Sequence, residues 1–216
     1  MTRFLIIGLA GLILAGCSQF GGEADRQQAQ QQWLRRQQSV QQFEIWDVHA
    51  RAVAILPGAV YHVGIRWQRD RKGYTILLEA PFGQGVFRLE STPGSSPPYR
   101  LSLPDGQVFE SESAEALLDQ VIGWSIPISG LEYWIRGIPR PGSDYSHQVG
   151  AGGRLKSLEQ DGWSIRYRDY FSTQDLPRLP RRMQLVHSDL TLKLVVEYWQ
   201  QSDNDQSPSE LFPEFN

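Results

Sequence analysis

Most of the chain after residue 44 alternates apolar and polar positions, which is the pattern of antiparallel strands buried on one face. The clearest run is Tyr61, Val63, Ile65 and Trp67, whose intervening residues are polar or glycine. Similar short runs cover residues 74–78, 86–91, 99–103, 107–110, 155–160, 163–167, 183–187 and 190–198. Turn sequences such as Asp161-Gly162 and Ser188-Asp189 separate neighbouring runs. The pattern therefore predicts about ten antiparallel strands.

Two helices are predicted in the middle of this series of strands. Ser113 is a suitable N-cap for the first helix, and Gly123 is suited to end it. The apolar face of this helix consists of Ala114, Leu117, Leu118, Val121 and Ile122. A capping box at residues 129–132 predicts the start of the second helix, with Gly137 and Pro139 as terminators. This order of elements predicts a strongly curved antiparallel sheet with helices on its concave side.

The segment from residue 19 to residue 42 is rich in glutamine. Such low complexity is typical of a disordered tether. However, Ala29, Trp33, Val40 and Phe43 have roughly heptad spacing, and neither Gly nor Pro follows Gly22 in this segment. We therefore expect a flexible stub over residues 17–22 and then a polar helix with a narrow apolar stripe. The stripe favours a helix laid over the body of the protein rather than a coil that binds a partner.

The N-terminus has the features of an export signal. Arg3 precedes an apolar run over residues 4–14, which is shorter than the roughly 20 residues that a membrane-spanning helix needs. The sequence Leu-Ala-Gly-Cys at residues 14–17 resembles the bacterial lipobox, which implies cleavage before Cys17 and acylation of that residue. Ser18 is compatible with the outer membrane. An ordinary signal peptide with a chance cysteine, or a membrane-anchoring helix, is the alternative.

Composition excludes several classes of function. The 216 residues include 21 Lys and Arg against 24 Asp and Glu, so the formal charge of −3 lacks the basic footprint of a nucleic-acid binder. A single Cys excludes an internal disulfide framework and a cysteine zinc cluster. The chain has no HExxH, GxSxG, GxGxxG or P-loop motif, and the glycine cluster at 150–153 is interpreted as a flexible loop. We therefore expect no catalytic site, cofactor or metal.

Stretches spread along most of the chain carry a family resemblance. They are residues 66–68 (RWQ), 74–83 (YTILLEAPFG), 131–139 (LEYWIRGIP) with 144–145 (DY), 162–167 (GWSIRY), Pro180, Met183 and 190–199. Together with Trp33 and the lipobox, this ordered set resembles the LolB family of outer-membrane lipoprotein receptors, although no single stretch is diagnostic. Residues 140–154 and the tail after residue 201 depart from the family pattern.

The resemblance implies a mainly β fold with a few helices. It would be an unclosed antiparallel β-barrel of about ten to eleven strands, with a helical lid around an apolar cavity. The chain would comprise a signal peptide (1–16), a lipidated stub (17–22), a LolB-like half-barrel (23–201) and a polar tail (202–216). In the family, the cavity holds acyl chains.

Several apolar residues are candidates for the wall of this cavity. They are Trp67, Tyr74, Ile76, Leu78, Trp134, Trp163, Tyr167, Leu192 and Leu194. Each of them could equally be an ordinary core residue. The 7 Trp residues favour a cavity, because a lipid pocket needs wide apolar faces that core packing does not use up.

The loop at residues 79–85 contains the most specific single candidate. Pro81 and Gly83 predict a turn with Phe82 at its tip. An aromatic residue at a hairpin tip can fold back onto the core. In the family, this position carries a protruding apolar residue that helps to insert the incoming lipoprotein, so the resemblance implies a membrane-contacting role for Phe82.

The resemblance implies a receptor that accepts triacylated lipoproteins from the periplasmic carrier LolA and inserts them into the outer membrane. Its partners would be LolA, the lipoprotein cargo and the outer-membrane lipid that holds its own anchor, and we expect a monomer. It would be anchored in the outer membrane of a Gram-negative bacterium and would face the periplasm. Two alternatives remain open: a structural or envelope-assembly lipoprotein with a dry packed core, and a membrane-anchored hydrolase with a cryptic site.

Overall fold

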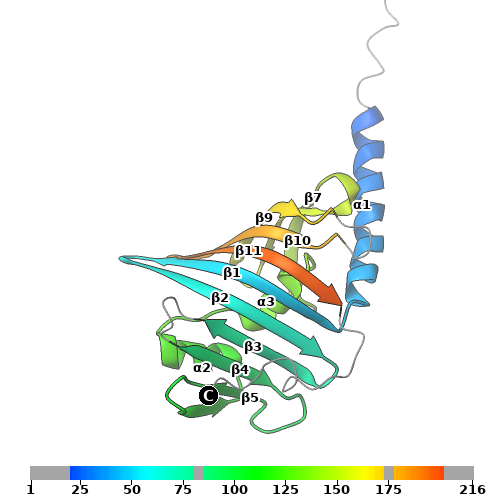
Figure 1. Ribbon diagram of the computed structural model, residues 1–216. Helices are drawn as coiled ribbons and strands as arrows, with labels where there is room; N and C mark the ends of the chain where they lie inside the picture. Colours follow the sequence, from blue (N-terminus) through cyan, green and yellow to red (C-terminus); the bar gives the residue numbers. More distant parts are fainter. Residues whose placement is uncertain (1–19, 80–84, 173–177, 202–216) are drawn as a thin grey trace, which may run out of the picture.

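Eleven strands form one antiparallel sheet in the computed structural model, which describes residues 20–79, 85–172 and 178–201. The strands are β1 (Trp46–Leu56), β2 (Ala59–Asp70), β3 (Gly73–Glu79), β4 (Val86–Ser91), β5 (Tyr99–Ser102), β6 (Val108–Ser111), β7 (Tyr145–Val149), β8 (Leu155–Gln160), β9 (Trp163–Tyr170), β10 (Pro180–His187) and β11 (Leu190–Gln201). Their order across the sheet is β6-β5-β4-β3-β2-β1-β11-β10-β9-β8-β7 (Figure 1). The predicted unclosed antiparallel fold is confirmed.

The sheet consists of two meanders that are joined in its middle. Consecutive strands pair from β1 to β6 and from β7 to β11, and β1 pairs with β11. Irregularities at His49/Ala50 in β1 and at Pro180–Met183 in β10 interrupt the pairing register. Because a bulge increases the local twist and bends its strand, these sites help the sheet to curve. Strands β6 and β7 remain as the two edges.

Helices α2 (Ala114–Ile122) and α3 (Ile128–Trp134) lie in the connection between the two edge strands, on the concave side of the sheet (Figure 1). The predicted caps of α2 are confirmed. Ser113 Oγ accepts a hydrogen bond from the Ala116 amide at 3.2 Å. Gly123 has a φ of 78°, and its amide bonds the Asp119 carbonyl. Such a left-handed residue ends a helix without the penalty of a Cβ atom.

The predicted capping box of α3 is wrong. The helix begins at Ile128 after Pro127, so Ser129 already lies inside its first turn. The Ser129 amide donates to Glu115 Oε1 of α2 at 2.9 Å, so a carboxylate of the neighbouring helix takes the place that the capping box assigned to Glu132. Glu132 forms an ion pair with Arg69 of β2 at 2.7 Å instead of turning back to a cap. The two helices are thus coupled to each other and to the sheet.

Helix α1 (Phe20–Gln41) stands along the β7 side of the sheet, and its N-terminal end extends past the body (Figure 1). It begins at Phe20, which lies inside the stretch expected to form a flexible stub. Of the apolar stripe, Trp33 and Val40 are fully buried and Ala29 is half-buried. The prediction of a helix laid over the body is therefore confirmed.

The glycine cluster at 150–153 is not the flexible loop that the sequence suggested. Residues Ala151–Gly153 form a short 3₁₀ helix, η2, that follows strand β7 and contacts α1. A Cβ atom on Gly153 would lie 2.4 Å from the Gln32 carbonyl carbon, and the φ of Gly153 is 68°. The glycine is therefore required by the close approach of α1.

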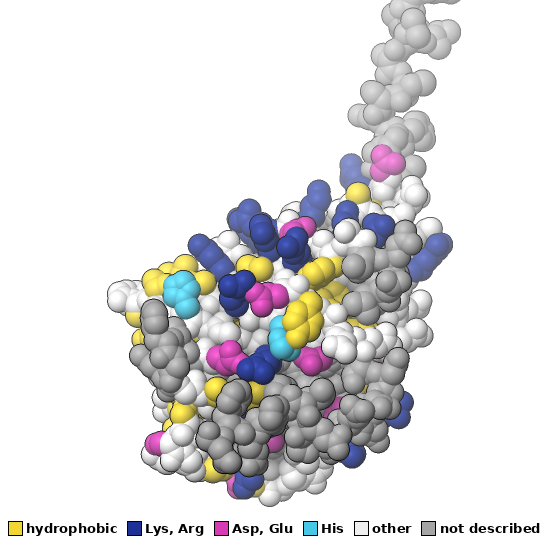
Figure 2. Space-filling view, viewed as in Figure 1, with side chains coloured by type: hydrophobic (Ala, Val, Ile, Leu, Met, Phe, Trp, Pro, Cys, Tyr) yellow, Lys and Arg dark blue, Asp and Glu magenta, His cyan; other side chains and the backbone are white. Residues whose placement is uncertain are grey.

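The outer face of the sheet is polar over strands β9 to β11. Figure 2 shows Lys and Arg side chains over this part of the molecule, and Arg166, Arg168, Arg182 and Lys193 are exposed there. Most large apolar residues of these strands lie on the opposite, concave side, whereas Val195 and Tyr198 of β11 are exposed. Among residues 20–79, 85–172 and 178–201, no helix is both long and apolar enough to cross a membrane.

Candidate functional site: an apolar cavity between the sheet and the helices

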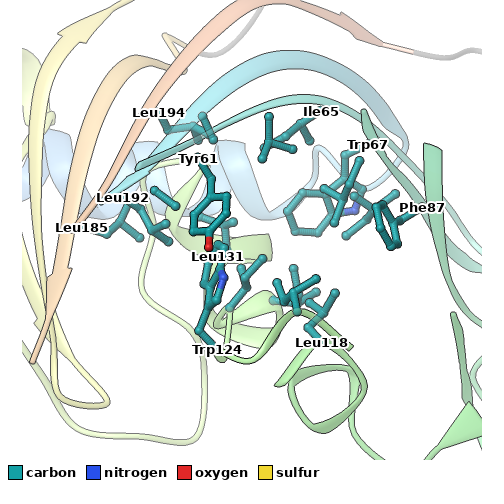
Figure 3. Close-up of a pocket in the computed structure, with 18 of the residues that line it drawn as sticks. Tyr61, Ile65, Trp67, Phe87, Leu118, Trp124, Leu131, Leu185, Leu192 and Leu194 are labelled. Carbon is teal, nitrogen blue, oxygen red and sulfur yellow. The ribbon is translucent and has the colours of Figure 1, made fainter. Parts of the chain in front are cut away.

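A cavity of about 340 Å³ lies between the concave face of the sheet and helices α2 and α3 (Figure 3). Strands β1, β2, β3, β4, β10 and β11 form one wall, and the helices with their connecting segment form the other. Apart from Tyr61 and His62, its lining side chains carry no titratable group. Because an unpaired charge in such a space would be costly, the cavity is suited to an apolar ligand.

Small residues on the central strand leave room for this cavity. Ala52 pairs with Leu194 of β11 and with Val63 of β2, and all three line the space. Ala54 is likewise flanked by Leu192 and Tyr61. Alanine side chains in the middle of the sheet, between larger neighbours, create a hollow that a Leu or Val in their place would fill.

The helical wall ends in an aromatic contact with the sheet. Leu118 of α2 and Leu131 of α3 face the cavity, and Trp124 lies between the helices. The Trp124 ring stacks on the Tyr61 ring with centroids 6.3 Å apart and an interplanar angle of 26°. Figure 3 shows the two side chains pointing toward each other across the cavity. Tyr61 is 49% exposed, so this aromatic pair lies at the mouth.

Five of the predicted wall residues line the cavity. These are Trp67, Ile76, Leu78, Leu192 and Leu194. The sequence analysis did not select several others, including Tyr61, Phe87, Leu118, Trp124, Leu131 and Leu185. A signal for some of them was available, because Tyr61 shares the strand face of Trp67 and Leu118 lies on the apolar face of α2.

The other four predicted wall residues lie outside the cavity lining. Tyr74 packs edge-on against Trp67, with ring centroids 5.7 Å apart. Trp134 donates its indole N–H to Gln160 Oε1 at 2.8 Å, and Tyr167 donates its hydroxyl to the Trp134 carbonyl at 3.0 Å. Trp163 packs against Trp134, with ring centroids 6.2 Å apart.

Their position follows from the placement of α3. One side of this helix faces the cavity and the other packs on β8 and β9, so Gln160 of β8 and the aromatic residues of β9 support the helix. Burial raises the pKa of the Tyr167 hydroxyl, which stays a neutral donor in this packing.

Cys17 and Phe82 both lie outside the described residues. Their roles in lipid attachment and membrane insertion therefore stay predictions. Glu79 and Val86, the ends of β3 and β4 on either side of the Phe82 loop, pair with each other.

A half-open antiparallel sheet whose helices enclose an uncharged apolar cavity defines a class of proteins that bind apolar ligands without covalent chemistry. Comparison with known proteins narrows this class. The family model for the outer membrane lipoprotein LolB matches residues 44–199. The chain belongs to the LolB family of outer membrane lipoproteins.

Individual relatives cover nearly the whole chain. The outer-membrane lipoprotein LolB of Nitrosococcus oceani is 34% identical over 199 residues, which cover 92% of this chain and 97% of the relative. The protein of the same name from Chromohalobacter salexigens is 32% identical over 189 residues, which cover 87% of this chain and 86% of the relative. A crystal structure of a LolA superfamily protein from Nitrosomonas europaea is similar in fold, with a TM-score of 0.53 at 12% identity, and covers 86% of this chain and 97% of that chain.

Proposed function

We propose that this protein is a lipid-anchored receptor of the outer membrane that takes the acyl chains of lipoproteins into its cavity and passes them to the membrane. The apolar cavity between α2–α3 and the sheet, in a chain that belongs to the LolB family, carries this proposal. The protein acts by binding and release rather than as an enzyme. A structural lipoprotein with a packed, dry core would not need such a cavity.

The direction of cargo transfer arises from increasing affinity at each step, because the proposed transfer uses no nucleotide. Cargo passes from the soluble carrier LolA to this cavity and then to the bilayer, and each site binds more tightly than the one before. A difference of about 1.4 kcal/mol between two sites shifts the equilibrium tenfold. Burial of about two additional methylene groups provides that difference at roughly 0.8 kcal/mol each.

The volume of the cavity limits what the closed conformation holds. A cavity of about 150 Å³ accommodates benzene, so the 340 Å³ found here have room for about a dozen carbon atoms. Three long acyl chains exceed this volume. The closed cavity thus holds the ends of the chains or one short chain, and full uptake of a triacylated cargo requires α2 and α3 to move away from the sheet.

Two residues outside the described part of the chain complete the proposal. Acylated Cys17 anchors the protein, because two or more acyl chains give effectively permanent membrane attachment. The protein thereby faces the periplasm from the outer membrane as a monomer. Phe82, in the loop between β3 and β4, contacts the bilayer during delivery of the cargo.

Displacement of a fluorescent probe tests this function directly. A dye that fluoresces in apolar cavities should bind the protein and be displaced by a synthetic triacylated lipopeptide, without cleavage of the lipopeptide.

Val63→Gln places an amide in the cavity wall and should weaken dye binding at least fivefold. The matched control is Val53→Gln, because Val53 is also half-buried but alternates with Ala52 and Ala54 on the outer face. Absence of dye binding, or equal effects of both substitutions, would refute the cavity as the binding site. Hydrolysis of the lipopeptide would instead support an enzyme.

A further inference from the structure

A second cavity of about 350 Å³ lies behind the helical wall of the first. Its lining is mixed in character and includes Glu115, Ser125, Arg140, Asp161, Trp163 and His187. In contrast with the apolar cavity, it offers cationic, anionic, hydroxyl and aromatic groups within one space. The acyl-chain function assigned to the first cavity does not use it.

The two cavities share one thin wall. In the segment that joins α2 to α3, Trp124, Ile126 and Ile128 line the apolar cavity. The alternate residues Ser125, Pro127 and Ser129 line the polar one. On strand β10, Leu185 borders the apolar cavity, and His187, two residues further along the same face, borders the polar one. The wall is therefore a single thickness of chain, and Gly123 and Ser125 are exposed at its rim.

The polar groups of the second cavity are held in position by the fold. Arg140 Nε donates to Asp161 Oδ2 at 3.0 Å, and this hydrogen bond lowers the pKa of the Asp161 carboxyl, which stays ionised. The exposed His187 ring stacks on the buried Trp163 ring, with centroids 5.0 Å apart. Glu115 is fixed by the Ser129 amide at 2.9 Å and by the Ser113 hydroxyl at 3.1 Å.

We propose that this polar pocket binds the peptide segment that follows the acylated cysteine of the cargo, while the acyl chains occupy the apolar cavity. The inference rests on the proposed function, because it requires a ligand with an apolar and a polar part joined at one residue. Two adjoining cavities of opposite character, separated by one thickness of chain, match such a ligand. The peptide crosses the rim at Gly123 and Ser125.

The composition of the pocket favours an extended peptide backbone over a particular side chain. A backbone offers N–H donors and carbonyl acceptors in alternation. The Arg140–Asp161 pair supplies one charge of each sign, and the Ser125 hydroxyl can either donate or accept. The exposed His187 ring, supported by Trp163, packs against the chain without reading its sequence. Recognition of this kind accepts lipoproteins whose N-terminal sequences differ.

Photo-crosslinking with the anchored, full-length protein in lipid nanodiscs tests the assignment. One probe is a triacylated Cys-Ser-Ser peptide with benzoylphenylalanine as its next residue, and the other carries a diazirine near the end of one acyl chain. The peptide probe should crosslink to residues 125–130 and to Trp163, and the acyl probe to the residues of the apolar cavity. Crosslinks of the peptide probe to the outer face of the sheet, or to no residue of the polar pocket, would overturn the inference.

A variant that fills the pocket provides a second measurement. Ser125 is exposed and lines the polar cavity, so Ser125→Trp should occupy the space without disturbing the core. We expect at least a tenfold loss of peptide crosslinking and acyl crosslinking within twofold of wild type. The control Gln120→Trp should change neither crosslink, because it places the same ring on an exposed residue of α2 that lines neither cavity. Equal loss of both crosslinks would show one continuous site and overturn the separate peptide pocket. Failure of the acyl probe in the wild-type protein would instead refute the proposed function itself.

Discussion

The length of alkyl chain that the protein binds should reveal the size of its cavity. With room for about a dozen carbons, the affinity for fatty acids should rise by up to fourfold per added carbon, since each buried methylene contributes roughly 0.8 kcal/mol. Beyond about twelve carbons, the affinity should level off in the closed conformation. Ala52→Phe should lower this limit, because Ala52 lies in the cavity wall between Leu194 and Val63.

The size of the effect of Ala52→Phe on the chain-length limit follows from the volume of the phenyl ring. The phenyl group adds six carbons and takes up about 150 Å³, which is a little under half of the 340 Å³ present. The limit should fall to six or seven carbons. Loss of five methylenes corresponds to an upper bound of about 4 kcal/mol, and incomplete filling reduces this value. We therefore expect the affinity for dodecanoate to fall at least 30-fold and the affinity for hexanoate to change little.

The assay is displacement of a cavity-binding dye by fatty acids of 6 to 16 carbons, with the protein in an anchorless form. Val53→Phe is the matched control, because it places the same ring one residue further along β1 on the outer face. Thermal unfolding should confirm that both variants fold. A wild-type affinity that keeps rising to 16 carbons, or an equal profile for the two variants, would refute the volume argument.

Substitutions at three further positions test other parts of the protein. Phe82→Glu should change the free energy of unfolding by less than about 1 kcal/mol and preserve uptake of cargo from the carrier, but it should impair delivery to liposomes. Phe82→Leu should retain most of the delivery. Equal delivery by the wild type and both variants would contradict a membrane role for Phe82. Cys17→Ala with a cleavable signal should yield a soluble protein that still accepts cargo in a solution transfer assay, and failure there would make the anchor part of the receiving site. Gly153→Ala should lower the free energy of unfolding by about 2 kcal/mol or more, as measured by denaturant titration. The new Cβ atom would collide with the α1 backbone, and the φ of 68° is unfavourable for alanine. An unchanged unfolding midpoint would contradict this contact.

Local patterns in the sequence predicted much of the sheet and the caps of α2. They failed where the deciding contact is remote in sequence. Strands β1 and β7 were not among the predicted runs. In β7, Tyr145, His147 and Val149 alternate with polar residues, but the run is short and mostly exposed, because an edge strand can form with little buried surface. The start of α3 depends on Glu115 of another helix, and the need for Gly153 depends on α1. No local periodicity contains these partners.

The candidate site shows the same limit. Periodicity correctly grouped Trp67, Ile76 and Leu194 as inward-facing residues, but it could not divide inward-facing residues between cavity and core. That division depends on where α3 lies: Trp163 and Tyr167 are also inward-facing, but α3 covers them. The hollow itself depends on Ala52 and Ala54, whose small size carries no signal of its own in a hydrophobic pattern.

The attachments of α2 and α3 determine how the cavity can open. Near the end of α3, Trp134 bonds Gln160, Glu132 pairs with Arg69, and the Arg136 guanidinium donates to the Phe43 carbonyl. At the other end of the wall, the contact across the mouth is the stacking of Trp124 on Tyr61. The helices are bonded to each other through Glu115 and the Ser129 amide.

We infer that the two helices move together between two fixed points, the start of α2 beside β5 and β6 and the end of α3, and that they open at Trp124. Because they lie between the unpaired edges β6 and β7, this motion breaks no hydrogen bond of the sheet. Backbone amides of α2 should then exchange hydrogen faster than those of residues 131–136, and a bound triacylated lipopeptide should increase the difference. Equal protection of both segments, with and without the lipopeptide, would show that the helical wall does not open in this way.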